Sequence, residues 1–131
     1  MPFRVIQPPS DQEQFTAEGK RLFAAAIGLG IPLEPEGFLY SWVNGTRVLV
    51  EETAEGEIIG FLLLTVGKRW THNDSTATVL AVETNGDFNG LIDFAKQIAC
   101  AFGSTELFLQ SKAVQRVGEE NRYTVIGYML G

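Results

Sequence analysis

Residues 47–66 read RVLVEETAEGEIIGFLLLTV, two strand-like runs that meet at Ala54-Glu55-Gly56. The first run, 48–53, is rich in β-branched residues, and the second, 58–66, is almost entirely apolar. Two such runs joined by turn residues predict a β-hairpin. Because the second run has no polar alternation, we expect a strand that is covered on both faces and lies in the centre of a sheet. Helices must then lie against that sheet.

Composition limits the classes of protein to consider. The 131 residues fit one domain, 1–131, with a core of its own. Sixteen acidic residues against ten Lys and Arg leave a net charge of −6, which disfavours direct binding to nucleic acid or to an anionic membrane. One cysteine, Cys100, allows no internal disulfide and favours a reducing compartment. Without a signal peptide or a long apolar segment, we expect a cytoplasmic protein.

Strand and helix patterns flank the hairpin on both sides. Phe3 to Ile6 is a short apolar run typical of a first strand. Ser10 and Glu13 form a capping-box pattern at the start of a helix. Before the hairpin we also expect a short helix at 36–43. After it we expect a polar loop at 67–75, a strand at 76–82, and a helix that Asn85-Gly86-Asp87 can cap and that ends near Phe102. The last elements are a strand at 106–110, a helical turn or two at 112–117 and a strand at 122–130.

The order of these elements predicts the fold class. The strand, helix and strand from 76 to 110 form a crossover, which should be right-handed and should make its two strands parallel. The other strands follow one another as an antiparallel meander. We therefore expect an α+β (mixed α/β) fold, with a central, mostly antiparallel sheet of about six strands and helices on both faces.

This order resembles the GNAT family of N-acetyltransferases along the whole chain. Residues 50–66, VEETAEGEIIGFLLLTV, are similar to the family's second and third strands. Residues 77–110, ATVLAVETNGDFNGLIDFAKQIACAFGSTELFLQ, are similar to its fourth strand, third helix and fifth strand. The opening FTAEGKRLFAAAIGLGIP, residues 15–32, also resembles the GNAT-like internal virion protein of short-tailed phages. The resemblance implies a GNAT-like fold and a relation to acetyl-CoA chemistry.

In that family, a loop between the fourth strand and the third helix carries the pattern Gln or Arg, two residues, Gly, one residue, Gly or Ala. Its backbone amides contact the pyrophosphate of acetyl-CoA. The best alignment here is residues 87–92, DFNGLI, in which only Gly90 fits, because Asp87 and Ile92 replace the first and last positions. A carboxylate beside two phosphates opposes binding by about 1 kcal/mol. Placing Asn85-Gly86 in the loop removes this repulsion but puts the later glycine out of register.

The resemblance also implies candidate site residues in case acetyl-CoA does bind. The backbone of Leu80 and Val82 would then hold the thioester. The pyrophosphate would lie against a further group of residues, namely Asn85, Gly86, Asn89 and Gly90.

Candidates for acid and base chemistry are few. Many family members carry a general-acid tyrosine on a fourth helix, and the matching position here is Val114, which cannot donate a proton. Tyr128 or Tyr123, on the last strand, could replace it, although a tyrosine there can equally pack its ring in the sheet. His72 and Glu83 are candidate bases for an amine substrate.

Several residues also have ordinary structural interpretations. Glu51 and Glu52 are alternative bases, but glutamates on strands are usually solvated, and Cys100 is expected as a small buried residue of the helix. One histidine and one cysteine cannot form a zinc site. Acidic residues at 34–36, 51–57 and 119–120 could form faces for a basic protein partner. Trp70, between basic residues, is a candidate contact residue.

Our leading hypothesis is a GNAT-fold protein with a degenerate acyl-CoA loop and no expected cofactor. It would act as a binding or structural protein, with a basic, phage or host protein as partner, in the host cytoplasm or in a virion if a phage encodes it. The first alternative is an active N-acetyltransferase that moves acetyl from acetyl-CoA to an amine. The second is an acidic inhibitor of a host enzyme. Neither a membrane nor a nucleic acid is expected as a partner.

Overall fold

The computed structural model describes the backbone of residues 2–68, 75–117 and 120–129 and the side chains of residues 2–67 and 75–109. These ranges form three helices and six strands, which lie in one sheet. In chain order they are β1 (Phe3–Ile6), α1 (Gln12–Gly28), α2 (Pro35–Val43), β2 (Arg47–Glu52), β3 (Ile58–Lys68), β4 (Ser75–Thr84), α3 (Phe88–Ala101), β5 (Ser104–Val117) and β6 (Glu120–Met129).

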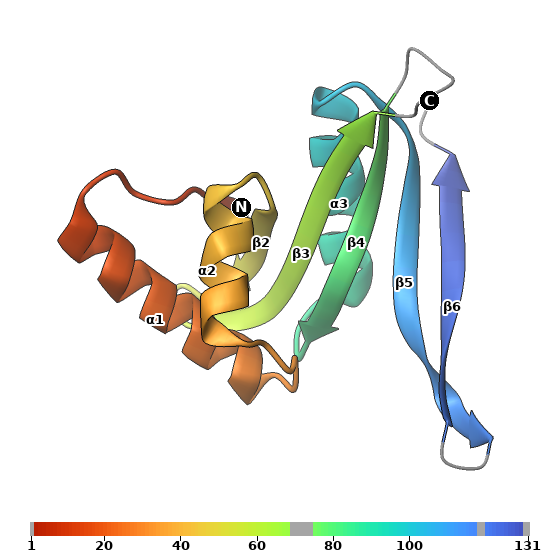
Figure 1. Ribbon diagram of the computed structural model, residues 1–131, viewed down its shortest axis with the longest axis horizontal. Coiled ribbons are helices and arrows are strands. Elements are labelled where there is room, and N and C mark those ends of the chain that lie inside the picture. Colours follow the sequence, from red (N-terminus) through yellow and green to blue (C-terminus); the bar gives the residue numbers. More distant parts are fainter. Residues whose placement is uncertain (1, 69–74, 118–119, 130–131) are drawn as a thin grey trace.

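The strands lie in the sheet in the order in which they occur in the sequence, from β1 to β6. Neighbours are antiparallel except β4 and β5, which are parallel and are connected through α3. Figure 1 shows α1 and α2 on one side of the sheet and α3 on the other. The predicted mixed, mostly antiparallel sheet with helices on both faces is therefore confirmed.

The predicted hairpin forms β2 and β3, and Gly56 in its turn has a φ of +84°, a conformation that glycine adopts without strain. Along β3, successive side chains alternate between two buried clusters. Phe61 and Leu63 belong to the cluster under α1 and α2, whereas Leu62 and Leu64 belong to the cluster under α3. Each of these four residues is buried, and burying one such side chain stabilises the fold by about 1.5–3 kcal/mol. The second run of the hairpin lacks polar alternation because β3 is covered on both faces, as predicted.

Trp42 is the centre of the cluster under α1 and α2. It is 1% exposed, and its indole Nε1–H donates a 3.1 Å hydrogen bond to the Ile6 carbonyl at the end of β1. Its ring stacks on Phe15 of α1 and on Phe38 of α2, with centroids 5.3 and 6.0 Å apart. This one residue therefore connects both helices to the edge of the sheet.

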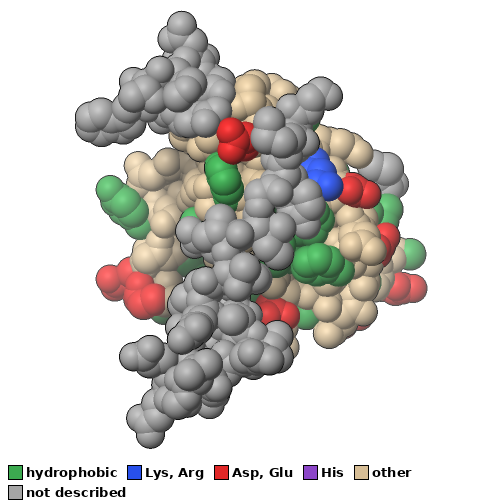
Figure 2. All heavy atoms as spheres, turned by 90° about the vertical axis from the view of Figure 1, so that its right-hand side faces the viewer, with side chains coloured by type: hydrophobic (Ala, Val, Ile, Leu, Met, Phe, Trp, Pro, Cys, Tyr) green, Lys and Arg blue, Asp and Glu red, His purple; other side chains and the backbone are tan. Residues whose placement is uncertain are grey.

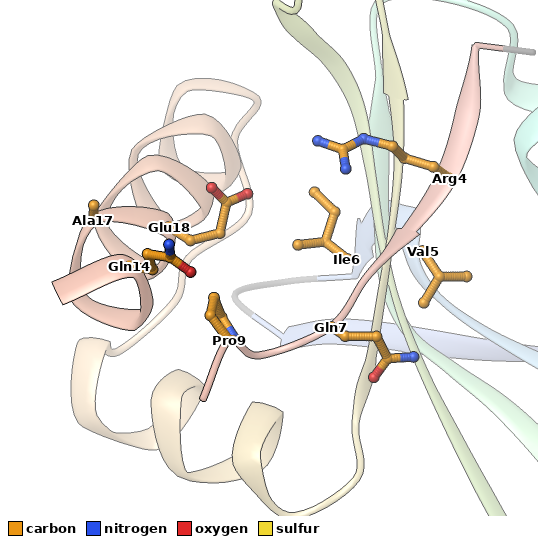
Figure 3. A pocket seen from close by; sticks show the side chains of 8 residues that line it. All are labelled: Arg4, Val5, Ile6, Gln7, Pro9, Gln14, Ala17 and Glu18. Carbon is orange, nitrogen blue, oxygen red and sulfur yellow. The ribbon is translucent and has the colours of Figure 1, made fainter. Parts of the chain in front are cut away.

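Ion pairs connect β1, β2 and α1 at the side of the molecule seen in Figure 3, where Arg4 and Glu18 line the groove between β1 and α1. The Arg4 guanidinium donates to Glu52, which raises the pKa of Arg4, although burial partly lowers it. Arg21 of α1 lies 2.7 Å from Glu18 and 3.7 Å from Glu52. The charges of this groove are thus largely neutralised within the chain.

The structure corrects three local predictions. The N-cap of α1 is Asp11, not Ser10, because the Asp11 carboxylate accepts from the Gln14 amide. Residues 112–117 are not helical but belong to β5, where their backbone pairs with β6. Cys100 is exposed rather than buried, since the inner face of α3 is formed by other residues of the same helix. Among the described residues, no helix is both long and apolar enough to cross a membrane.

Candidate functional site

Strand β4 contains a bulge at Leu80, the first of the predicted thioester residues. The pairing with β3 passes from Ala81 to Val79 without a partner for Leu80, and the pairing with β5 ends at Val79. Leu80 therefore has no counterpart in either neighbouring strand, and its side chain is 45% exposed. Because of the extra residue, side chains two positions apart no longer point to the same face of the sheet. Val79 packs under α3, whereas Ala81 packs on the side of α1 and α2.

Beyond the bulge, β4 has an open edge. Figure 1 shows β5 bending away from the lower end of β4. The Asn85 amide donates a 2.8 Å hydrogen bond to the Ile59 carbonyl of β3. In an antiparallel pair of strands, residues that bond to the partner strand alternate with residues whose backbone groups point away from it. Counting back from Asn85, the backbone groups of Val82 point away from β3. Val82, one of the two predicted thioester positions, thus has its backbone groups on the open edge of β4.

The turn from β4 to α3 is held by its own hydrogen bonds. The Gly86 amide donates to the Thr84 hydroxyl oxygen at 2.8 Å, and that hydroxyl donates to the Ile59 carbonyl at 3.2 Å. Asn85 is exposed and makes its backbone contact to β3. The Gly86 amide, one of the predicted pyrophosphate donors, is therefore already bound within the chain.

Two carboxylates occupy the N-terminus of α3. The Asp87 carboxylate accepts a 3.0 Å hydrogen bond from the Gly90 amide, so that Asp87, the last residue of the predicted capping segment 85–87, is the N-cap of this helix. The Asp87 amide in turn donates a 2.9 Å hydrogen bond to Oε1 of Glu51, which comes from β2. The N-terminus of a helix carries partial positive charge, so each carboxylate placed there stabilises the helix by about 0.3–1 kcal/mol. Two amides at the start of α3, those of Asp87 and Gly90, are thus bound within the chain, and two negative charges already lie at its partial positive charge.

Glycines make room for the Glu51 carboxylate. A Cβ on Gly86 would overlap the carboxylate oxygen, and a Cβ on Gly60, opposite Glu51 in β3, would lie 3.2 Å from the Glu51 Cβ. Glu51 is only 8% exposed in this position. The expectation that the glutamates of this strand are solvated is therefore wrong for Glu51, and the sequence analysis did not identify its contact with α3.

The other predicted pyrophosphate residues are placed around this contact. Asn89 is exposed in the first turn of α3, next to Gly90. Ile92, which stands at the family's small position, is 4% exposed and packs in the cluster under α3. A glycine or alanine at residue 92 would consequently leave a cavity in that cluster.

The predicted acid and base residues do not form a described catalytic group. Glu83 is exposed on β4, opposite Phe61 of β3. Tyr128 pairs with Leu107 through its backbone in β6, its side chain lies outside the described residues, and so does the whole of His72. Val114 lies in β5, so the described residues include no fourth helix to carry a general acid. The same residues contain no group of metal ligands.

Solved structures share this arrangement of strands and helices. An aminoglycoside acetyltransferase from an uncultured soil metagenomic sample has a TM-score of 0.63 at 13% identity, over 86% of this chain and 80% of that chain. A ribosomal-protein-alanine N-acetyltransferase from Brucella melitensis has a TM-score of 0.63 at 13% identity, over 87% of this chain and 83% of that chain. A GNAT family acetyltransferase from Staphylococcus aureus has a TM-score of 0.63 at 16% identity, over 95% of this chain and 98% of that chain. The fold is GNAT-like.

At these identities the GNAT likeness concerns the fold and leaves the activity open. No protein-family model matches the sequence, and no curated protein matches it. The function must therefore be inferred from the residues at the GNAT-like site itself.

Proposed function

We propose that this chain is a GNAT-fold binding or structural protein in which the loop for acyl-CoA is no longer functional. One observation carries the proposal: the amides of Asp87 and Gly90 are bound by the carboxylates of Glu51 and Asp87. A diphosphate would have to displace these carboxylates or accept their repulsion, which amounts to about 1 kcal/mol per pair even in water at 4 Å. We therefore expect no acetyl-CoA cofactor.

A protein partner is the expected ligand of such a domain. On α2, Tyr40 and Val43 are three residues apart and 72% and 58% exposed, so this helix offers two neighbouring apolar side chains to a partner. The affiliation of that partner, a basic, phage or host protein, stays a prediction, as does a cytoplasmic location. The neighbours described above are acetyltransferases and give the phage resemblance no support.

An acidic inhibitor is a weaker alternative, because acidic residues of the chain have internal roles. Glu34 accepts from the amides of Glu36 and Gly37 and so caps α2. Glu51 binds at α3, and Glu52 is paired with Arg4. On the face in Figure 2, the described acidic side chains are spread apart rather than gathered into one patch. These uses leave less negative surface for a basic enzyme than the composition suggests.

An active N-acetyltransferase remains the second candidate, and the bulge at Leu80 favours it. The open edge at Val82 offers backbone groups at the position where the family holds the thioester. Glu83 or His72 would serve as the base and Tyr128 as the acid. In this alternative acetyl-CoA would bind by the open edge of β4, without amides from the α3 terminus.

Thermal unfolding with and without acetyl-CoA tests the proposal, since a ligand that binds the folded state raises the melting temperature. We expect no shift for the wild type at millimolar acetyl-CoA. The variants Glu51→Ala and Asp87→Ser remove the two carboxylates, and their combination should gain a shift. The control pair Glu13→Ala and Asp93→Ser changes the charge equally at exposed positions and should gain none.

A shift of the wild type at micromolar acetyl-CoA would overturn the proposal. Release of free thiol from acetyl-CoA in the presence of amines would establish the second candidate. If the combined variant gains no shift, the two carboxylates do not cause the loss of binding, and the loop geometry itself must be the reason.

A further inference from the structure

A cavity of about 340 Å³ lies between α1 and α2, on the opposite side of the sheet from α3. This size is within the lower part of the range for ligand pockets, about 300–1,000 Å³. Its wall contains Phe15, Phe23, Phe38 and Leu39, so most of the side chains facing it are aromatic or aliphatic. The cavity is therefore suited to an apolar ring or a short hydrocarbon chain.

The floor of the cavity is closely packed. Phe15 and Phe38 both stack on Trp42, which is 1% exposed behind them. Gly19 allows the two helices to approach closely, because a Cβ at this residue would lie 2.9 Å from Leu39 Cδ2. Side chains held in this way do not need to be ordered when a ligand binds, which favours affinity.

The rim is polar and carries one kind of charge. Gln12, Thr16 and Lys20 lie on successive turns of α1 and are exposed. Lys20 is the only charged residue that lines the cavity, and within the described residues it makes no ion pair. In a chain with a net charge of −6, a cavity lined by one lysine and no carboxylate selects for an anionic group.

We propose that this cavity binds a small amphiphile with one apolar ring or short chain and one carboxylate, which faces Lys20. The size argues for a small molecule, since a helix or strand of a partner would not enter a volume of about 340 Å³. The inference goes beyond the proposed function and is independent of the α3 terminus, so the two can fail separately.

Fluorescence of Trp42 provides the test. The chain has two tryptophans, and the Trp70→Phe variant leaves Trp42 as the only emitter. This variant is titrated with 4-phenylbutyrate, with the neutral 4-phenylbutanol and with the cationic 4-phenylbutylamine. We expect a saturable change with all three probes, and an affinity for the carboxylate about tenfold higher than for the amine, because only the carboxylate is attracted to the ammonium group.

Substitutions at exposed rim residues locate the site without disturbing the core. Lys20→Glu should reverse the preference, so that the amine binds more tightly than the carboxylate. Lys96→Glu on α3 makes the same change in net charge and should leave the preference for the carboxylate unchanged. Thr16→Phe should fill the entrance and weaken all three probes, whereas Ala17→Phe, next to it but lining the groove of Figure 3, should leave them unchanged.

Absence of a saturable Trp42 signal with any probe at millimolar concentration would overturn the inference. Equal affinity for the three probes, unaltered by Lys20→Glu, would overturn the assignment of a carboxylate ligand. If Ala17→Phe weakened binding as much as Thr16→Phe, the probes would be binding elsewhere on α1.

Discussion

The bulge at Leu80 and the turn at the start of α3 are neighbouring parts of one GNAT-like site, yet they differ in what their backbone offers. At the bulge, β4 separates from β5 but stays paired with β3, and Val82 directs its backbone groups to the open edge. At the turn, the amides of Gly86, Asp87 and Gly90 are all bound by side chains of the chain itself.

The difference teaches that fold and ligand chemistry depend on different contacts. The bulge is a feature of strand pairing, and it decides that Val79 and Val82 pack with the cluster under α3 and Ala81 with the other cluster. The turn depends on individual side chains, chiefly Glu51 and Asp87, which can change without changing the fold. A GNAT-like sheet can therefore form whichever side chains lie at the start of α3.

The largest effect is expected from shortening a side chain beneath the turn. Ile92→Ala removes buried atoms from the cluster under α3 and should lower the free energy of unfolding by about 2–5 kcal/mol. Leu80→Ala, at the exposed bulge, should lower it by about 0.5 kcal/mol or less. Urea denaturation of both variants measures the contrast. Equal losses would mean that the bulge is as tightly packed as the turn.

The second effect is smaller and concerns Glu51. Glu51→Ala leaves the Asp87 amide without its partner and should cost about 1–3 kcal/mol in unfolding free energy. Gly86→Ala should also destabilise, because its Cβ overlaps the same carboxylate. In the double variant Gly86→Ala, Glu51→Ala the overlap with the carboxylate is absent and only the close contact with Ile59 Cδ1 stays, so the combined loss should be smaller than the sum of the two single losses. Additive losses in chemical denaturation would contradict the contact.

Removing the helix cap should have a smaller effect still. Asp87→Ala loses the hydrogen bond to the Gly90 amide and should reduce stability by about 1 kcal/mol. Asp87→Ser keeps an oxygen that can cap and should recover most of the loss. The melting temperatures of the three proteins provide the measurement, and an Asp87→Ser protein no more stable than Asp87→Ala would contradict the capping role.

The smallest effect needs no substitution. Hydrogen exchange of the wild type should be fast at the Val82 amide, which lies on the open edge, and slower at the Asp87 amide, which Glu51 holds. Two-dimensional NMR in deuterated buffer gives both rates in one experiment. Strong protection at Val82 would mean that another segment covers the edge of β4.

Much of the architecture could be predicted from local patterns. Unbroken apolar residues predict β3 as a central strand, and the residues 85–87 predict the start of α3. The sequence predicts a helix cap within Asn85-Gly86-Asp87, because capping involves residues only three positions apart, and the structure assigns the cap to Asp87. Alternation was less reliable along β4, where the bulge at Leu80 changes which face the side chains occupy.

The state of the candidate site could not be read from such patterns. Glu51 and Asp87 are 36 positions apart, and only the pairing of β2, β3 and β4 brings the carboxylate to the helix. The same holds for residues 112–117, whose backbone hydrogen bonds go to β6 rather than to a helical turn. Short-range spacing is a property of the chain and specifies its elements, whereas the contact that occupies the anion site exists only after distant strands have paired.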